Sequence, residues 1–114
     1  MRFRHKDFER FEKQIILKKI GVSGQKKIFN SKVLIIGVGG LGCPLLTYLA
    51  GSGVGKIGIV DHDKVDISNL PRQVLFSEND LNVSKVIVGK KLLNQIVPAV
   101  DVDAVEENAD ETNL

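Results

Sequence analysis

The sequence predicts an α/β fold in which the chain forms the N-terminal half of a doubly wound parallel sheet, preceded by helices. Residues 32–37 and 56–61 are short segments with apolar residues on both faces, as in strands that lie inside a parallel sheet. Segments with a helical spacing of apolar residues follow them, at 40–51 and 83–96. Strands that alternate with helices in this way indicate parallel pairing through crossovers.

The first 31 residues are predicted to form a helical segment of their own. Residues 7–19 have charged residues on one side, and Gly21 is predicted to end this helix. A short second helix is expected at 23–29. The apolar face of the first helix is formed by Phe8, Phe11, Ile15 and Ile16.

Residues 32–114 are predicted to form a Rossmann-like, three-layer nucleotide-binding domain. A ligand of such a sheet binds at the carboxyl ends of the strands. Here those ends carry a glycine-rich turn, Asp61 and a long polar loop. The elements are expected in the order strand 32–37, helix 40–51, strand 56–61, loop, helix 83–96 stopped by Pro98, and strand 99–105.

Composition excludes several classes of function. The chain has 114 residues and a net charge of only +2, so it offers no broad basic surface for nucleic acid or anionic lipid. No apolar run is long enough to span a bilayer. Its single cysteine, Cys43, excludes an internal disulfide and a cysteine-cluster zinc site within this chain, and we expect a reducing cytoplasm. No metal-ligand set is predicted, and Cys43 is expected to be a small buried residue.

The stretch "VLIIGVGGLG" carries the first functional motif. Gly37, Gly39 and Gly42 match the pattern G-x-G-x-x-G between a strand and a helix. One glycine makes the tight turn, one lets a phosphate approach the backbone, and one lets helix and strand pack closely. Gly40 removes a further side chain from that approach. The pattern predicts a nucleotide phosphate at this turn, whereas a turn without a ligand is the structural alternative.

Asp61 ends the second strand, about 20 residues beyond the glycines, where an acidic side chain meets ribose hydroxyls. This position suits NAD and ATP equally, and a turn cap is the alternative role. Asp63 and Asp66 are interpreted as loop and cap residues.

The stretch "ISNLPRQ" and a lysine at the start of the next helix favour a triphosphate. Arg72 can grip phosphate with two parallel donors, and Lys85 adds a point charge. Asn69 and Gln73 can donate to phosphate oxygens. Taken alone, Arg72 and Lys85 are better explained as two solvated surface charges.

Together these motifs resemble the adenylyltransferases related to ubiquitin-activating enzymes, the ThiF, MoeB and HesA proteins. The resemblance rests on "RFEKQIIL", "GQKKIFNSKVLIIG", "GVGGLG" and "GSGVGKIGIVDHDKVDISNLPRQVLF", followed by the helix lysine. It covers nearly the whole chain, from about Phe8 to Val105.

The resemblance implies ATP-dependent adenylation of the C-terminal glycine of a ubiquitin-like sulfur carrier, in thiamine or molybdopterin biosynthesis, by a homodimer. Gly40 then lies at the phosphate loop and Asp61 holds the ribose, and Lys13 stands where the family has an arginine that reaches the partner subunit's ATP. The family's magnesium-binding aspartate, and its later cysteines, are expected beyond the end of this chain. The residues placed around the triphosphate are Asn69, Arg72, Gln73 and Lys85, with Arg72 and Lys85 stabilising the leaving pyrophosphate.

Two other functions stay open at this point, an NAD(P)-binding domain of an oxidoreductase and a catalytically silent nucleotide-binding or dimerisation module. The strand at 32–37 also predicts self-association, because it is apolar on both faces and only Lys32 protects it. We expect residues 32–37 of two chains to pair, or elements to be exchanged between chains.

Overall fold

A computed structural model describes residues 5–39, 42–71, 73, 75–110 and 112 of the chain. Its centre is a sheet of three parallel strands in the order β1-β2-β3, namely β1 (Lys32–Ile36), β2 (Lys56–Val60) and β3 (Asp101–Val105). The strands are in step, so that Lys32, Lys56 and Asp101 form one row across the sheet. The sheet, its parallel pairing and its order confirm the predicted Rossmann-like half-sheet.

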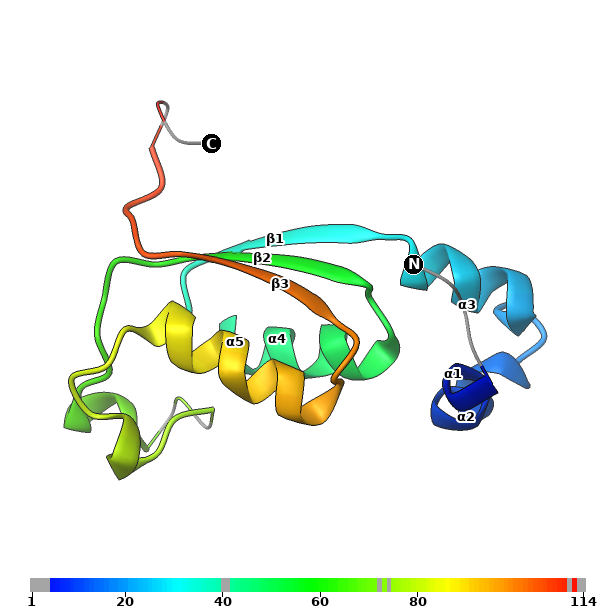
Figure 1. Cartoon of the computed structure of the whole chain (residues 1–114), viewed down its shortest axis with the longest axis horizontal. Coiled ribbons are helices and arrows are strands. Elements are labelled where there is room, and N and C mark those ends of the chain that lie inside the picture. The colour runs from blue at the N-terminus through cyan, green and yellow to red at the C-terminus, as the bar shows by residue number, and fades with distance from the viewer. Residues whose placement is uncertain (1–4, 40–41, 72, 74, 111, 113–114) are drawn as a thin grey trace.

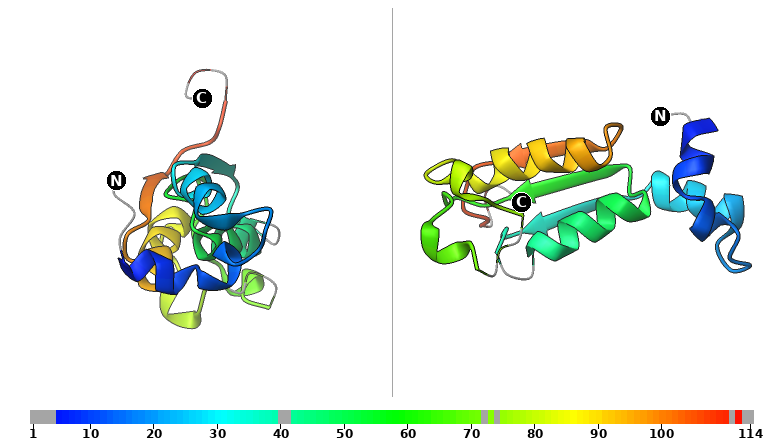
Figure 2. Two further views of the ribbon diagram at one scale, coloured as in Figure 1. Left: turned by 90° about the vertical axis from the view of Figure 1, so that its right-hand side faces the viewer. Right: turned by 90° about the horizontal axis from the view of Figure 1, so that it is seen from below.

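Two helices, α4 (Gly42–Ser52) and α5 (Lys85–Ile96), cover one face of the sheet, as Figures 1 and 2 show. Each crossover advances the sheet in the same direction, so right-handed connections bring both helices to the same face. The opposite face carries exposed side chains of β1. The core lies between this sheet face and the helices, and its fully buried members include Leu46, Ile57, Ile59, Val86 and Leu93.

The N-terminal segment differs from the single helix expected at 7–19. It forms α1 (His5–Arg10), α2 (Glu12–Ile15) and α3 (Gly21–Phe29). The chain breaks at Phe11, whose ψ of 15° lies outside the helical range, and Gly21 begins a helix with a φ of +58° instead of ending one. Because the helix stops early, the expected apolar face is not continuous, and Phe11 is buried whereas Ile16 is 69% exposed.

Buried polar contacts fix this segment to the amino ends of the strands. Gln25 is fully buried, and its Nε2 donates to the Ser52 carbonyl at 2.9 Å while its Oε1 accepts from Gln14 at 2.8 Å. Gln14 also donates to the Ser52 carbonyl, at 3.0 Å. A Cβ at Gly55 would meet the Phe29 carbonyl oxygen, so only glycine fits where α3 crosses this end of the sheet.

The loop between β2 and α5 is folded rather than open. Its single turns η1 (Ile67–Asn69) and η2 (Glu78–Asp80) each begin at a capping side chain. An antiparallel bridge joins Lys64 to Ser84 and brings the start of α5 back to the end of β2. No helix in the described part of the chain is long and apolar enough to cross a membrane.

Candidate functional site

The glycine-rich turn leaves β1 where the motif predicted it. The Gly37 N–H donates to the Val60 carbonyl at 2.8 Å, and the φ of Gly37 is +90°, a conformation that favours glycine. A Cβ at Gly42 would meet the Gly37 carbonyl oxygen, so the start of α4 packs directly on the turn. Gly39 has open space around it. The fourth predicted glycine, Gly40, lies outside the described residues.

Asp61 ties the turn to the next strand. Its Oδ2 accepts from the Val38 N–H at 2.7 Å, and its Oδ1 accepts from the Asp63 N–H at 2.8 Å. The backbone of Asp61 continues the sheet by donating to the Val105 carbonyl at 3.2 Å. The carboxylate is therefore fixed at the carboxyl ends of the strands, and each oxygen keeps a lone pair for a further donor.

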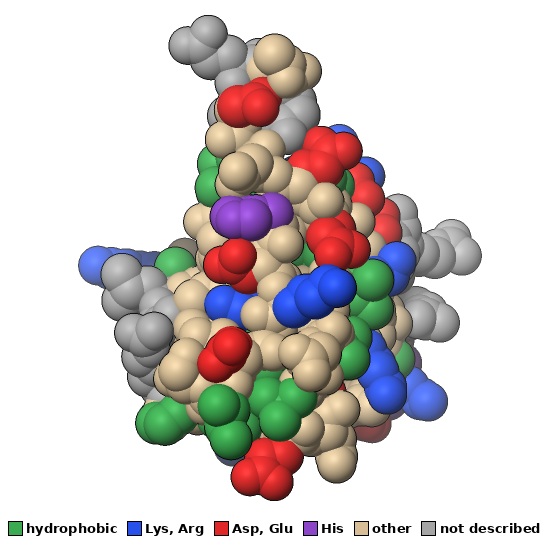
Figure 3. Space-filling view, turned by 90° about the vertical axis from the view of Figure 1, so that its left-hand side faces the viewer, with side chains coloured by type: hydrophobic (Ala, Val, Ile, Leu, Met, Phe, Trp, Pro, Cys, Tyr) green, Lys and Arg blue, Asp and Glu red, His purple; other side chains and the backbone are tan. Residues whose placement is uncertain are grey.

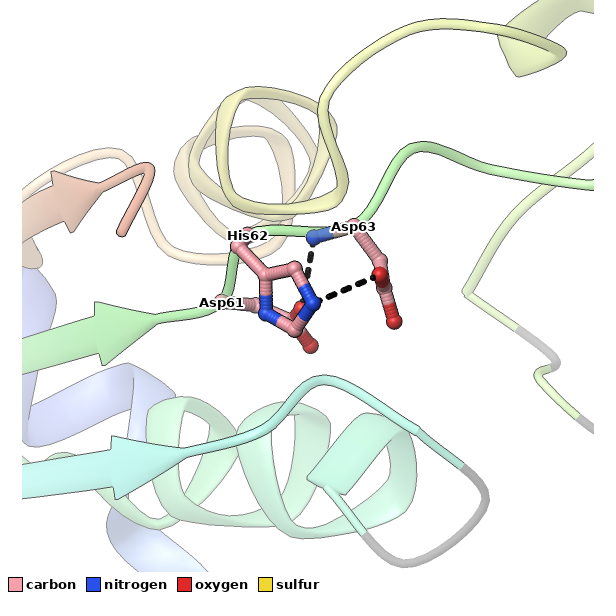
Figure 4. A group of neighbouring side chains, drawn as sticks. All are labelled: Asp61, His62 and Asp63. Carbon is pink, nitrogen blue, oxygen red and sulfur yellow. Dashed lines mark hydrogen bonds and ion pairs between the residues drawn. The ribbon is translucent and has the colours of Figure 1, made fainter. Parts of the chain in front are cut away.

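Asp61, His62 and Asp63 form a group with the composition of a metal site. One potential ligand atom from each lies within 4.8 Å of the others. Figure 4 shows the His62 ring turned toward Asp63, and its Nε2 lies 3.2 Å from Asp63 Oδ1. The His62–Asp63 pair and the backbone bonds to Asp61 already account for this arrangement.

A cavity of about 270 Å³ opens beside this group, between the ends of β1 and β2. Its wall includes Gly37, Asp61 and His62, together with residues 107–109 that follow β3. Figure 3 looks onto this end of the molecule and shows histidine, acidic and basic side chains close together. The cavity thus lies where a parallel sheet binds its ligand.

Lys85 is buried at the first turn of α5, with 5% of its surface exposed. Its backbone N–H donates to the Asp63 carbonyl at 3.1 Å, which places the residue beside the end of β2. Within the described residues no carboxylate forms an ion pair with its ammonium. Lys85 is therefore a buried residue and not one of the exposed surface charges of the alternative prediction. A lysine held beside the end of β2 suits an anionic ligand.

The charges of Lys85 and Asp61 also act on the thiol of Cys43. Burial raises the pKa of the Cys43 thiol. A hydrogen bond with the Leu75 backbone and the positive charge of Lys85 lower this pKa, whereas the negative charge of Asp61 raises it further. Cys43 is fully buried, as the sequence predicted, and this argues against a nucleophilic role.

Two buried polar atoms have no hydrogen-bond partner among the described residues, namely Ser84 Oγ, next to Lys85 in the sequence, and Gln73 Oε1 in the loop before α5. Gln73 is 3% exposed and Ser84 is 6% exposed. Buried polar groups are nearly always paired, so these two indicate a site that a ligand or water completes. The sequence analysis missed Ser84, because a serine before a helix is usually its cap, and here the side chain makes no cap bond.

The remaining predicted residues are placed differently. Asn69 Oδ1 accepts from the Asp66 N–H at 3.0 Å, and Asp66 caps η1 by accepting from Ser68, which confirms the cap role expected for Asp66. Those backbone and side-chain bonds to Ser68 lower the pKa of Asp66. Lys13 is exposed on α2, and Figure 1 places α2 at the amino ends of the strands, away from Asp61. Arg72 lies outside the described residues.

Comparison with known proteins identifies the family. The model of the ThiF family matches residues 11–114. The chain belongs to the ThiF family. This confirms the resemblance inferred from the glycine turn, Asp61 and the loop motif.

Curated ThiF relatives are much longer than this chain. It is 44% identical over 110 residues to the molybdopterin-synthase adenylyltransferase of Haemophilus influenzae, covering 96% of this chain and 45% of that protein. It is 40% identical over 104 residues to the sulfur carrier protein adenylyltransferase of Thermus thermophilus, covering 91% of this chain and 38% of that protein. The chain therefore spans less than half the length of these relatives.

A solved structure extends the similarity to the fold. Escherichia coli tRNA N6-threonylcarbamoyladenosine dehydratase, TcdA, crystallised in complex with ATP, superposes with a TM-score of 0.91. The match covers 99% of this chain and 46% of TcdA, at 23% sequence identity. At that identity the likeness concerns the fold, and it agrees with the ThiF assignment.

Proposed function

We propose that this chain carries the ATP site of an adenylyltransferase that activates the C-terminal glycine of a ubiquitin-like sulfur carrier in the cytoplasm. The observation that carries the proposal is the buried position of Lys85 at the start of α5, without a carboxylate ion pair among the described residues and next in sequence to the unpartnered Ser84 Oγ. The names of the curated relatives, which are adenylyltransferases of sulfur carriers and of molybdopterin synthase, support it.

Each group of the site has a role in this proposal. Gly37 makes the tight turn, since its own N–H bonds to Val60, and the backbone N–H groups at Gly39 and Gly42 face the phosphates. Asp61 accepts from the ribose hydroxyls. Lys85, with Arg72, stabilises the charge of the pyrophosphate that leaves when the carrier carboxylate attacks the α-phosphate. Asn69 and Gln73 orient the outer phosphates with their amide N–H groups. Magnesium would supply positive charge to the triphosphate, and none of these residues is proposed as its ligand.

An NAD(P) site is the second candidate, since Asp61 suits the ribose of either nucleotide. The position of Lys85 favours ATP. A dinucleotide has a single pyrophosphate, whereas a triphosphate extends further anionic groups that the charge of Lys85 can neutralise.

The test is calorimetric titration of the 114-residue chain with ATP, AMP and NAD. We expect Lys85→Met to weaken ATP binding by about 1.5–3 kcal/mol, the range for hydrogen bonds to charged groups, and to change AMP binding far less. Lys91→Met is the matched control, because Lys91 is an exposed lysine on the same helix. Equal losses for ATP and AMP, or preferential binding of NAD, would contradict the proposal.

Lys13 is proposed to serve the nucleotide of the second subunit in a homodimer. This proposal is supported by the separation of Lys13 from the nucleotide site of its own chain, because α2 and Asp61 lie at opposite ends of the sheet (Figure 1). We expect a mixture of Lys13→Ala and Arg72→Ala chains to recover part of the ATP binding that either variant lacks. Lack of recovery would make Lys13 a surface charge.

A further inference from the structure

The single turns η1 and η2, both in the loop between β2 and α5, begin with the same reciprocal arrangement of side chain and backbone. At η1, Asp66 Oδ1 accepts from the Ser68 N–H at 2.9 Å, and Asn69 Oδ1 accepts from the Asp66 N–H at 3.0 Å. At η2, Asp80 Oδ2 accepts from the Ser77 N–H at 2.8 Å. In both turns the side chain of the last residue therefore holds the backbone of the residue that precedes the turn.

The two turns differ in what this last side chain has left to offer. Asp80 carries a carboxylate, which accepts hydrogen bonds and donates none. Asn69 carries an amide whose orientation is fixed, because the Asp66 N–H is a donor and requires Oδ1, not Nδ2, opposite it. Nδ2 lies on the other side of the amide, and among the described residues it donates to no acceptor. Asn69 therefore keeps two N–H donors for a ligand, in a fixed direction, whereas Asp80 has none.

Asp66 is suited to hold this arrangement at neutral pH. Its backbone is extended, with φ −119° and ψ 150°, as is usual for the residue that caps a helical turn. Its hydrogen bonds to Ser68 lower the pKa of its carboxyl group, and the positive charge of Lys85 also lowers this pKa. The cap is therefore ionised, and the charge of Lys85, which belongs to the proposed ATP site, acts on it.

We propose that Asp66 is a positioning residue of the nucleotide site, which holds η1 so that Asn69 presents its amide N–H donors to phosphate oxygens. This role rests on the proposed function, in which Asn69 orients the outer phosphates. A side chain that is held in place before the nucleotide arrives does not have to be immobilised on binding. That difference corresponds to about two- to tenfold in affinity for one side chain.

Calorimetric titration with ATP tests whether Asp66 acts through Asn69. We expect Asn69→Ala to weaken ATP binding about tenfold or more, and Asp66→Ala about two- to tenfold. Asp66→Asn should bind like wild type, because asparagine caps a helical turn as well as aspartate does. In a chain that already carries Asn69→Ala, Asp66→Ala should have no further effect, since the amide that it positions is gone.

Ser77→Ala is the matched control, because it removes the capping side chain of η2, whose last residue has no donor to present. It should leave ATP binding unchanged, and urea denaturation checks that each variant is folded. An equal loss with Ser77→Ala, or a full effect of Asp66→Ala in the Asn69→Ala chain, would overturn the positioning role.

NMR relaxation of the Asn69 side-chain amide, measured without nucleotide, separates this inference from the proposed function. We expect Nδ2 to be rigid on the ps–ns timescale in wild type and Asp66→Asn, and mobile in Asp66→Ala. An amide as rigid in Asp66→Ala as in wild type would overturn the role of Asp66, whatever the affinity for ATP. An amide that behaves as expected in a chain to which ATP does not bind would instead contradict the proposed function, and with it the nucleotide role of Asn69.

Discussion

Two buried glutamines, at opposite ends of the sheet, have opposite hydrogen-bonding states. Gln25 is fully buried at the amino ends of the strands, and both ends of its amide are paired, with Gln14 and with the Ser52 carbonyl. Gln73 is 3% exposed near the carboxyl ends, and its Oε1 has no partner among the described residues. The first amide is fully paired within the fold, whereas the carbonyl oxygen of the second has no partner among the described residues.

The two ends of the sheet do not differ in open space. At the packed end, near Gln25, the apolar space beneath Phe11 and Phe29 amounts to about 10 Å³, but cavities of about 290 Å³ beside Arg10 and about 170 Å³ beside Lys32 also lie at the amino ends of the strands. A cavity of about 270 Å³ lies beside Asp61 at the carboxyl ends. The difference between the ends is therefore the pairing of their buried polar groups. Unpaired buried polar groups destabilise a fold, so their persistence indicates function.

The largest expected effect is at the packed end. Gly55→Ala places a Cβ against the Phe29 carbonyl oxygen, which is backbone and cannot turn aside. We expect a loss of about 3 kcal/mol in the free energy of unfolding, measured by urea denaturation. Gly51→Ala is the control, because nothing lies within 4 Å of a Cβ there and the site is in a helix. That variant should be stabilised by up to about 1 kcal/mol.

Replacing the paired glutamine should have the next largest effect. Gln25→Leu keeps the volume but leaves the Gln14 amide without its acceptor in a partly buried place. We expect a loss of about 1–3 kcal/mol in the free energy of unfolding. An unchanged urea midpoint would mean that the network at Ser52 does not hold the N-terminal helices in place.

Replacing Cys43, at the start of α4, should have a smaller effect on the free energy of unfolding. Burial raises the pKa of its thiol, so the folded state holds this proton more tightly than the unfolded state does. The resulting stability is complete below the ordinary thiol pKa and is lost as pH rises through the folded value. In urea titrations at alkaline pH, wild type should therefore lose more stability than Cys43→Ala, and the thiol should react slowly with thiol reagents until the chain unfolds. Equal pH dependence of the two chains would contradict the burial.

The sheet was predictable from the sequence, and the N-terminal helices were predictable only in part. Apolar runs such as 32–37 determine strands because burial on both faces leaves few other arrangements. The break at Phe11 depends on how that ring packs against Gly53, a tertiary contact that no local pattern contains.

The candidate site was likewise predictable from the sequence only in part. The sequence pointed to Asp61 and Lys85 by their spacing from the glycine turn. It did not indicate that Lys85 is buried without an ion pair, or that Ser84 makes no cap, because both follow from how the loop folds back through the Lys64–Ser84 bridge.

The most direct test of the account measures the free energy of unfolding of Gln73→Leu, with and without ATP, beside wild type and Gln25→Leu. Without ATP we expect Gln73→Leu to match or exceed the stability of wild type, since it removes an unpartnered polar atom, while Gln25→Leu is destabilised. ATP should stabilise wild type and Gln25→Leu alike and Gln73→Leu less. A Gln73→Leu chain as destabilised as Gln25→Leu, and stabilised by ATP as much as wild type, would show that Gln73 serves the fold and not the nucleotide.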